Sequence, residues 1–179
     1  MANCGVTASP PRPWLERMNP DPPPPATFGP AAMAHLALAA SARVVSDFAR
    51  GLVPTHPGRA GYGGLLTGDA VQLGRLVDDV LAAAIVAERA HGVGWEDIGD
   101  ALGLDPDQAR DRWAATVDRW DTDLARAAGP AHDDDQLPEV LTGPPTARAR
   151  ELDRWATRHR EPDDLTEGPH PVTDALSGG

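Results

Sequence analysis

The sequence predicts an all-α fold, and three observations support this prediction. Apolar residues recur at steps of three and four along several stretches, which is the period of a helix with one buried face. No stretch shows the alternation of Val, Ile and aromatic residues that is typical of a strand. The 19 Pro and 18 Gly exceed the ordinary share of these residues, so part of the chain should lie outside a packed core. We therefore expect a small helical domain with disordered flanking tails.

Residues 1–29 should form a disordered, proline-rich tail. The first thirty residues contain nine Pro, four of them consecutive from Pro22 to Pro25. Because proline fixes φ and lacks an amide donor, such a segment is extended and polyproline-like. A solvated tail is the simplest interpretation, and docking to a proline-recognising partner is the alternative.

The helical domain should span residues 30–128 and begin with two long helices. Pro30 suits the first turn of a helix that Gly51 and Pro54 end. A second helix should begin near Asp69, a plausible N-cap, and stop at Gly92. The apolar positions of the first helix are Met33, Ala37, Ala40, Val44 and Phe48. Those of the second form a stripe broad enough to predict a central helix: Leu73, Leu76, Val77, Val80, Leu81, Ala84 and Ile85.

Residues 95–120 should form two helices joined by a sharp turn. A short helix from Trp95 to Leu102 is followed by Gly103, where a left-handed backbone would let the chain reverse. Asp105 should cap the next helix, which would start at Pro106. The inward positions of this second helix are Ala109, Trp113, either Thr116 or Val117, Trp120 and Leu124, and the outward ones include Asp107, Arg110, Asp111 and Asp118.

This segment resembles the helix-turn-helix of sigma-factor region 4 and related bacterial regulators. The resemblance covers about twenty residues, through the string Ile98-Gly99-x-x-Leu102-Gly103-Leu104-Asp105-x-x-x-Ala109-x-x-Arg112-Trp113. It implies a tri-helical DNA-binding unit, supported by the helix that ends at Gly92. It departs from the family pattern at Asp105, where Ser or Thr is usual, because the carboxylate adds negative charge where phosphates would approach.

The resemblance implies a transcriptional regulator that binds double-stranded DNA, possibly as a homodimer, with the helix that starts at Pro106 in the major groove. Base contacts would come from Gln108, Arg110 and Asp111, and a phosphate contact from Arg112. Further phosphate contacts would come from Arg148, Arg150 and Arg154, on a basic helix expected over residues 147–160.

Charge supports a second hypothesis. The net charge is −11, from 27 acidic residues against 16 basic ones, which are all Arg, so the chain as a whole is not a basic coat for nucleic acid. Affinity for DNA rests largely on cations that neutralise phosphates. The outward acids at Asp107 and Asp111 therefore favour an interaction module that keeps the helix-turn-helix framework but binds a protein, such as a transcription factor or polymerase, without binding DNA.

The C-terminal part should contain an acidic, proline-bearing loop at 129–146, the basic helix at 147–160 and a disordered tail at 161–179. On the basic helix, Thr146 could act as the cap, and Leu152 and Trp155 lie on one side. Trp155 could enter a groove of a partner, or it could pack onto the domain while the arginines pair with nearby acids.

No catalytic arrangement is visible, so we expect a non-enzyme without a cofactor. The six His lie in different segments at spacings that fit no metal site, and Cys4 alone excludes an intramolecular disulfide. No signal peptide or membrane-spanning run is present, which predicts a cytoplasmic protein.

Overall fold

The computed structural model describes residues 28–53, 63–129, 137–160 and 168–177, and within these ranges the fold is all-α, as predicted. The expected N-terminal tail lies almost entirely outside the described residues, as do residues 130–136 of the acidic loop and residues 161–167. The elements are α1 (Pro30–Leu52), α2 (Leu65–Ala90), α3 (Trp95–Leu102), α4 (Pro106–Ala127), the 3-10 turn η4 (Glu139–Leu141), α5 (Pro145–Arg158) and α6 (Pro171–Ser177).

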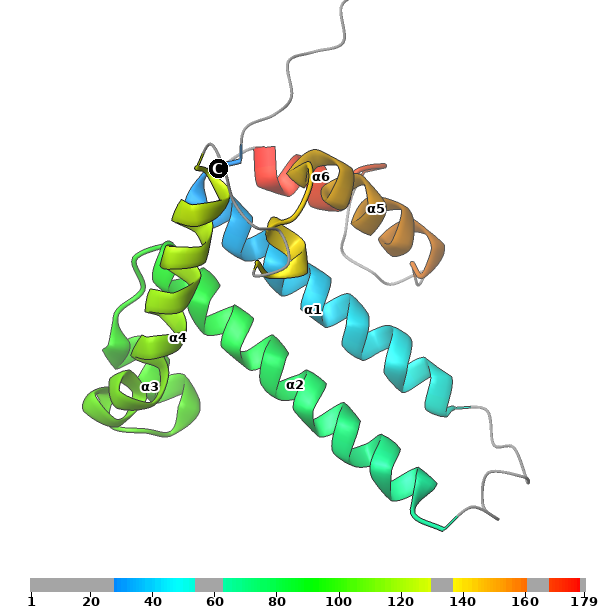
Figure 1. The fold of residues 1–179 in the computed structure, drawn as a ribbon, viewed down its shortest axis with the longest axis horizontal. Helices are drawn as coiled ribbons and strands as arrows, with labels where there is room; N and C mark the ends of the chain where they lie inside the picture. The colour runs from blue at the N-terminus through cyan, green and yellow to red at the C-terminus, as the bar shows by residue number, and fades with distance from the viewer. Residues whose placement is uncertain (1–27, 54–62, 130–136, 161–167, 178–179) are drawn as a thin grey trace, which may run out of the picture.

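Helices α1 and α2 form a long antiparallel hairpin (Figure 1). Helix α1 begins at Pro30, as the sequence predicts, and ends close to Gly51. Helix α2 begins at Leu65, four residues before the predicted cap at Asp69. Its N-cap is Gly64, which has φ 82° and supplies no side-chain hydrogen bond, so the prediction from capping residues was wrong at this end.

The two halves of the hairpin differ in burial. Near the C-terminus of α2, Ile85, Val86 and Ala87 are buried, as a central helix requires. Toward the N-terminus of α2, however, Val77 is 50% exposed and Leu66 is 55% exposed. On α1, Val44 was expected in the core and is 50% exposed. The prediction of a central α2 therefore holds only for the half that α4 also contacts.

The main core lies where the N-terminal half of α1 meets α2, α4, α5 and η4. One cluster of buried side chains joins these elements: Met33, Ala34, Leu36, Val86, Ala87, Trp120, Leu137, Leu141, Ala149 and Leu152. Residues beyond 128 thus contribute to the same core, which corrects the predicted domain end at 128. The physical reason is the apolar side of α5, since Ala149 and Leu152 pack against α1 rather than standing in solvent.

The predicted C-terminal tail contains a helix. Helix α6 lies beside α5 and also contacts α1, and Val172 and Leu176 pack against the core (Figure 1). Asp153 of α5, only 3% exposed, accepts hydrogen bonds from the backbone N–H groups of Val172 (2.7 Å) and Thr173 (3.1 Å). A carboxylate thus satisfies free amides of the first turn of α6, which holds this short helix in place.

Within the described ranges, no helix combines the length and apolar character that crossing a membrane requires.

Candidate functional site

The turn between α3 and α4 has the geometry that the sequence predicts. Gly103 is left-handed, with φ 65° and ψ 33°, and the N–H of Leu104 donates to the carbonyl of Gly99 over 2.8 Å. A Cβ on the buried Gly99 would lie 2.8 Å from the carbonyl oxygen of Leu104 and 3.3 Å from the nitrogen of Pro106. Only a residue without a side chain therefore lets α3 approach the start of α4 this closely.

A reciprocal capping box fixes the start of α4. The side chain of Asp105 accepts from the N–H of Asp107 at 2.9 Å, and the N–H of Asp105 donates to Oε1 of Gln108 at 3.2 Å. Gln108, predicted to contact a base, thus contributes to the cap through its side-chain oxygen. The D-x-x-Q spacing of these residues was the sequence signal for this role.

The outer side of α4 carries a row of carboxylates, which we call the acidic face: Asp107, Asp111 and Asp118. All three are exposed, at spacings of four and seven residues that bring them to one side of the helix. Within the described part of the chain, none of them takes part in an ion pair. Their charge is therefore available to a partner.

The arginines of α4 do not offset this charge. Arg110, Arg112 and Arg119 are exposed, and the guanidinium of Arg112 lies 5.4 Å from the ring centre of Trp113. Arg126 pairs with Asp123 at 2.9 Å. Residues 95–127 contain nine acidic residues against these four arginines, a net charge of −5. The predicted DNA-contacting residues Arg110, Asp111 and Arg112 are thus accessible, but Arg110 and Arg112 lie on different sides of α4, and the unit that carries them is acidic overall.

Arg89, at the end of α2, supports the chain just before α3. Its guanidinium donates to the carbonyl of Val93 and lies 4.9 Å from the ring centre of Trp95. Its Nε is buried and, within the described residues, has no hydrogen-bond partner. This arginine is part of the framework rather than of the outer surface.

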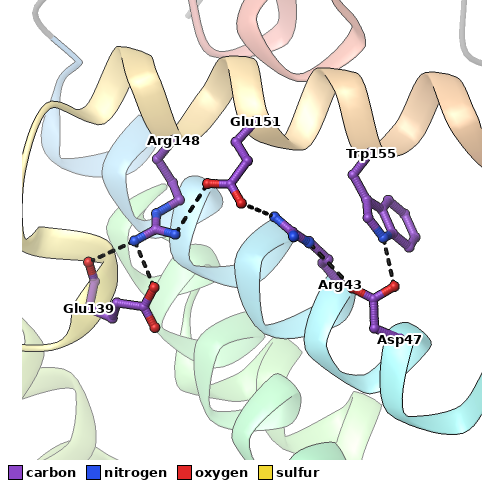
Figure 2. Close-up of polar contacts among 6 residues, drawn as sticks. All are labelled: Arg43, Asp47, Glu139, Arg148, Glu151 and Trp155. Carbon is purple, nitrogen blue, oxygen red and sulfur yellow. Dashed lines mark hydrogen bonds and ion pairs between the residues drawn. The ribbon is translucent and has the colours of Figure 1, made fainter. Parts of the chain in front are cut away.

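Arg148, predicted to contact phosphate, belongs to a polar network between α1, η4 and α5 (Figure 2). It pairs with Glu139 at 2.9 Å and with Glu151 at 3.5 Å, and Glu151 accepts from Arg43 of α1 at 2.6 Å. Its side chain is 24% exposed. Arg148 therefore joins α5 to its neighbours and is not free for a nucleic acid.

Trp155 completes this network and does not project toward a partner. Its indole N–H donates to Asp47 of α1 at 2.8 Å, and Asp47 also accepts from Arg43 at 3.4 Å (Figure 2). The hydrogen bond from Trp155, and then those from Arg43, lower the pKa of Asp47. The hydrogen bond from Arg43 likewise lowers the pKa of Glu151. Both carboxylates are thus held in their charged forms.

The two sets of predicted DNA contacts lie apart. Arg150 and Arg154 are exposed on α5, which packs against α1 and α6. In Figure 1, α5 lies on the opposite side of the α1–α2 hairpin from α3 and the start of α4. The basic residues of α5 therefore do not extend the surface around Arg110 into one positive stripe.

Sequence reasoning missed several residues that position this structure. Arg43 and Asp47 are spaced as an (i, i+4) pair, which is visible in the sequence. Glu151 lies 108 positions from Arg43, and no local pattern could have joined them. Asp153 gave no signal either, because its partners belong to a segment predicted to be disordered.

The described residues contain no cluster of three or more His, Cys, Asp or Glu that could hold a metal ion. In comparisons with known proteins, no family model, curated protein or solved structure matches the chain.

Proposed function

We propose that the protein is an interaction module that uses the acidic face of α4 to bind a basic surface of a protein partner. A helix-turn-helix framework, formed by the end of α2 with α3 and α4, would present this face. The exposed row Asp107, Asp111 and Asp118 carries the proposal, because no described cation pairs with it. Carboxylates arranged on one side of a rigid helix complement a basic patch on a partner, and their charge raises the rate at which the two proteins associate.

The rigidity of the framework supports this function. The capping box at Asp105 and the close approach at Gly99 fix the first turn of α4, where Asp107 lies. A preorganised face loses little conformational freedom on binding, which favours affinity. The partner would be a basic element of the transcription machinery, such as a transcription factor or polymerase.

A titration with a defined basic probe tests the proposal. A fluorescent, arginine-rich peptide is titrated with the full chain and with the Asp107→Asn/Asp111→Asn variant, and anisotropy is measured. We expect the double variant to bind about tenfold more weakly, equivalent to about 1.4 kcal/mol for two lost charge pairs. Raising the salt should weaken binding by the original chain more than by the variant.

Asp78→Asn/Asp79→Asn is the matched control, because it removes the same charge from the exposed side of α2. We expect this control to keep its affinity within about twofold. Equal losses in the two double variants would mean that the peptide senses only net charge, and the proposed docking face would be rejected.

DNA binding is the second candidate, favoured by the sharp turn at Gly103 and by the exposed Arg110 near the start of α4. In this case a gel mobility-shift titration with genomic duplex fragments should show binding that falls as salt rises. Arg110→Ala should then weaken binding by about 1–3 kcal/mol. Absence of a shift at low salt would leave the protein-partner function.

A further inference from the structure

A cationic groove lies between α5 and α6, on the side of the hairpin opposite to α3 (Figure 1). Its volume is about 600 Å³, which is within the range of small-molecule sites. The residues that give the groove its charge are Arg150, Arg154 and Arg158, and His170 also lines it. The groove is open to solvent, so a ligand would enter without displacing either helix.

The three arginines form a row along α5. They are four residues apart, so successive Cα atoms lie about 6 Å apart on one side of the helix. All three are exposed, and within the described residues none of them makes an ion pair, although Arg154 acts at longer range on Glu151. Arg148, on the same helix, has two carboxylate partners.

The three arginines of this row repel one another. Like charges one turn apart on a helix repel each other, so Arg154 is repelled by its neighbours on both sides, and a bound anion would relieve this repulsion. The net charge of the chain is −11, so the row of three arginines is not the result of a generally basic composition.

The carboxylate within the groove does not neutralise the row. Asp153 is 3% exposed, and its oxygens accept hydrogen bonds from the Val172 and Thr173 amides and from the Thr173 hydroxyl. Within the described residues, the basic side chain next to Asp153 is His170, with Nδ1 3.9 Å from Oδ2. Asp153 therefore uses its oxygens as acceptors for α6. The guanidinium groups of the arginine row remain exposed and can donate hydrogen bonds to a ligand.

We propose that the α5–α6 groove binds a phosphate group, with Arg154 and Arg158 as the main donors and Arg150 at the rim. A planar guanidinium group can donate two parallel hydrogen bonds to phosphate oxygens. A phosphate dianion carries two negative charges, so it can pair with more arginines than a single carboxylate can. The phosphate could belong to a small molecule, such as a mononucleotide, or to the backbone of a nucleic acid. This site lies apart from the acidic face and does not depend on the proposed function.

Isothermal titration calorimetry of the full chain tests the site with three probes: inorganic pyrophosphate, AMP and a duplex DNA. The groove variant is Arg154→Gln/Arg158→Gln. The control is Arg50→Gln/Arg75→Gln, which removes the same charge from exposed positions on α1 and α2. We expect binding of pyrophosphate or AMP to weaken at least about tenfold in the groove variant and to stay within about twofold in the control.

The pattern of binding identifies the source of the phosphate. Binding of pyrophosphate or AMP that depends on the groove supports a small-molecule ligand. Binding of the duplex alone, with the same dependence on Arg154 and Arg158, supports the phosphate site with a nucleic acid as its source. The proposal is overturned if none of the probes binds, or if the groove and control variants lose affinity equally.

Discussion

A side chain on Gly99 would collide with the backbone of Leu104. A Cβ built on Gly99 lies 2.8 Å from the Leu104 carbonyl oxygen, and the Leu104 N–H donates to the Gly99 carbonyl at 2.8 Å. Gly103 has open space around its Cβ position but requires a positive φ of 65°. The two glycines of this turn are thus required for different reasons, a close approach at one and a backbone conformation at the other.

Gly99→Ala should lower the free energy of unfolding by about 1–3 kcal/mol, because the added methyl group overpacks the α3–α4 crossing. Urea denaturation followed by circular dichroism measures this change. Gly74→Ala is the control, since Gly74 lies within α2 with open space around it. This control should stabilise the chain by about 0.5–1 kcal/mol. A stabilising Gly99→Ala would show that α3 does not approach α4 as described.

Asp153→Ala should loosen α6. The substitution removes the acceptor for the Val172 and Thr173 amides and should cost about 1–3 kcal/mol. Hydrogen exchange should speed up most strongly over residues 171–177, because this helix has only seven residues and Asp153 holds its first turn. Asp121→Ala, at an exposed position on α4, is the control and should leave that exchange unchanged. Unaltered protection of α6 in Asp153→Ala would contradict the role of this carboxylate.

Acid should weaken the contact between α1 and α5. The pKa of Glu151 lies below its ordinary value of 4.5 because Arg43 donates to it, and the pKa of Asp47 lies below 3.8 because Trp155 and Arg43 donate to it. Since both values are lowered in the folded state, the contribution is complete above about pH 4.5 and is lost as the pH falls through the folded values. Chemical denaturation at a series of pH values measures this loss.

Removal of one carboxylate isolates the contribution of the network. Glu151→Gln should cost about 0.2–1 kcal/mol at pH 7, as expected for a partly exposed pair, and should flatten the pH dependence below about pH 4.5. Glu96→Gln is the control, because Glu96 is exposed and, in the described structure, makes no ion pair. An identical pH dependence in Glu151→Gln and the original chain would show that the Arg43–Glu151 pair does not contribute.

The hairpin should open locally at its outer half. Amides of residues 66–77 in α2 should exchange faster than those of residues 83–87, because Leu66, Val71 and Val77 are at least half exposed whereas Ile85 is 2% exposed. Hydrogen exchange measured by mass spectrometry distinguishes the two segments. Equal protection at low protein concentration would contradict the difference in burial.

The sequence correctly predicted the helix ends that are determined by residues at the ends themselves. Pro30 at the start of α1, Gly103 at the turn and Asp105 as the cap of α4 were all identified correctly, because each constrains the backbone at its own position. The start of α2 was wrong because Gly64 provides no capping side chain, while Asp69 lies inside the helix.

Features formed by distant contacts were not predictable. Helix α6 depends on Asp153, whose partners lie 19 and 20 positions away, and its seven residues show too little periodicity to predict a helix. The exposure of Val44 and Val77 depends on where other elements stop covering the hairpin, which no single helix encodes. The acidic character of α4 could be read from its sequence, but the separation of the start of α4 from the arginines of α5 required the fold.

The end of the hairpin offers a place for a chemical label. The side chain of Val53 is 76% exposed and directly follows α1, whose C-terminal end lies far from α3 and α6 in Figure 1. A fluorophore attached to a Val53→Cys variant, with Cys4 replaced by Ser, would leave both the acidic face and the cationic groove unobstructed. The same labelled protein could then report on peptide and phosphate ligands within one experiment.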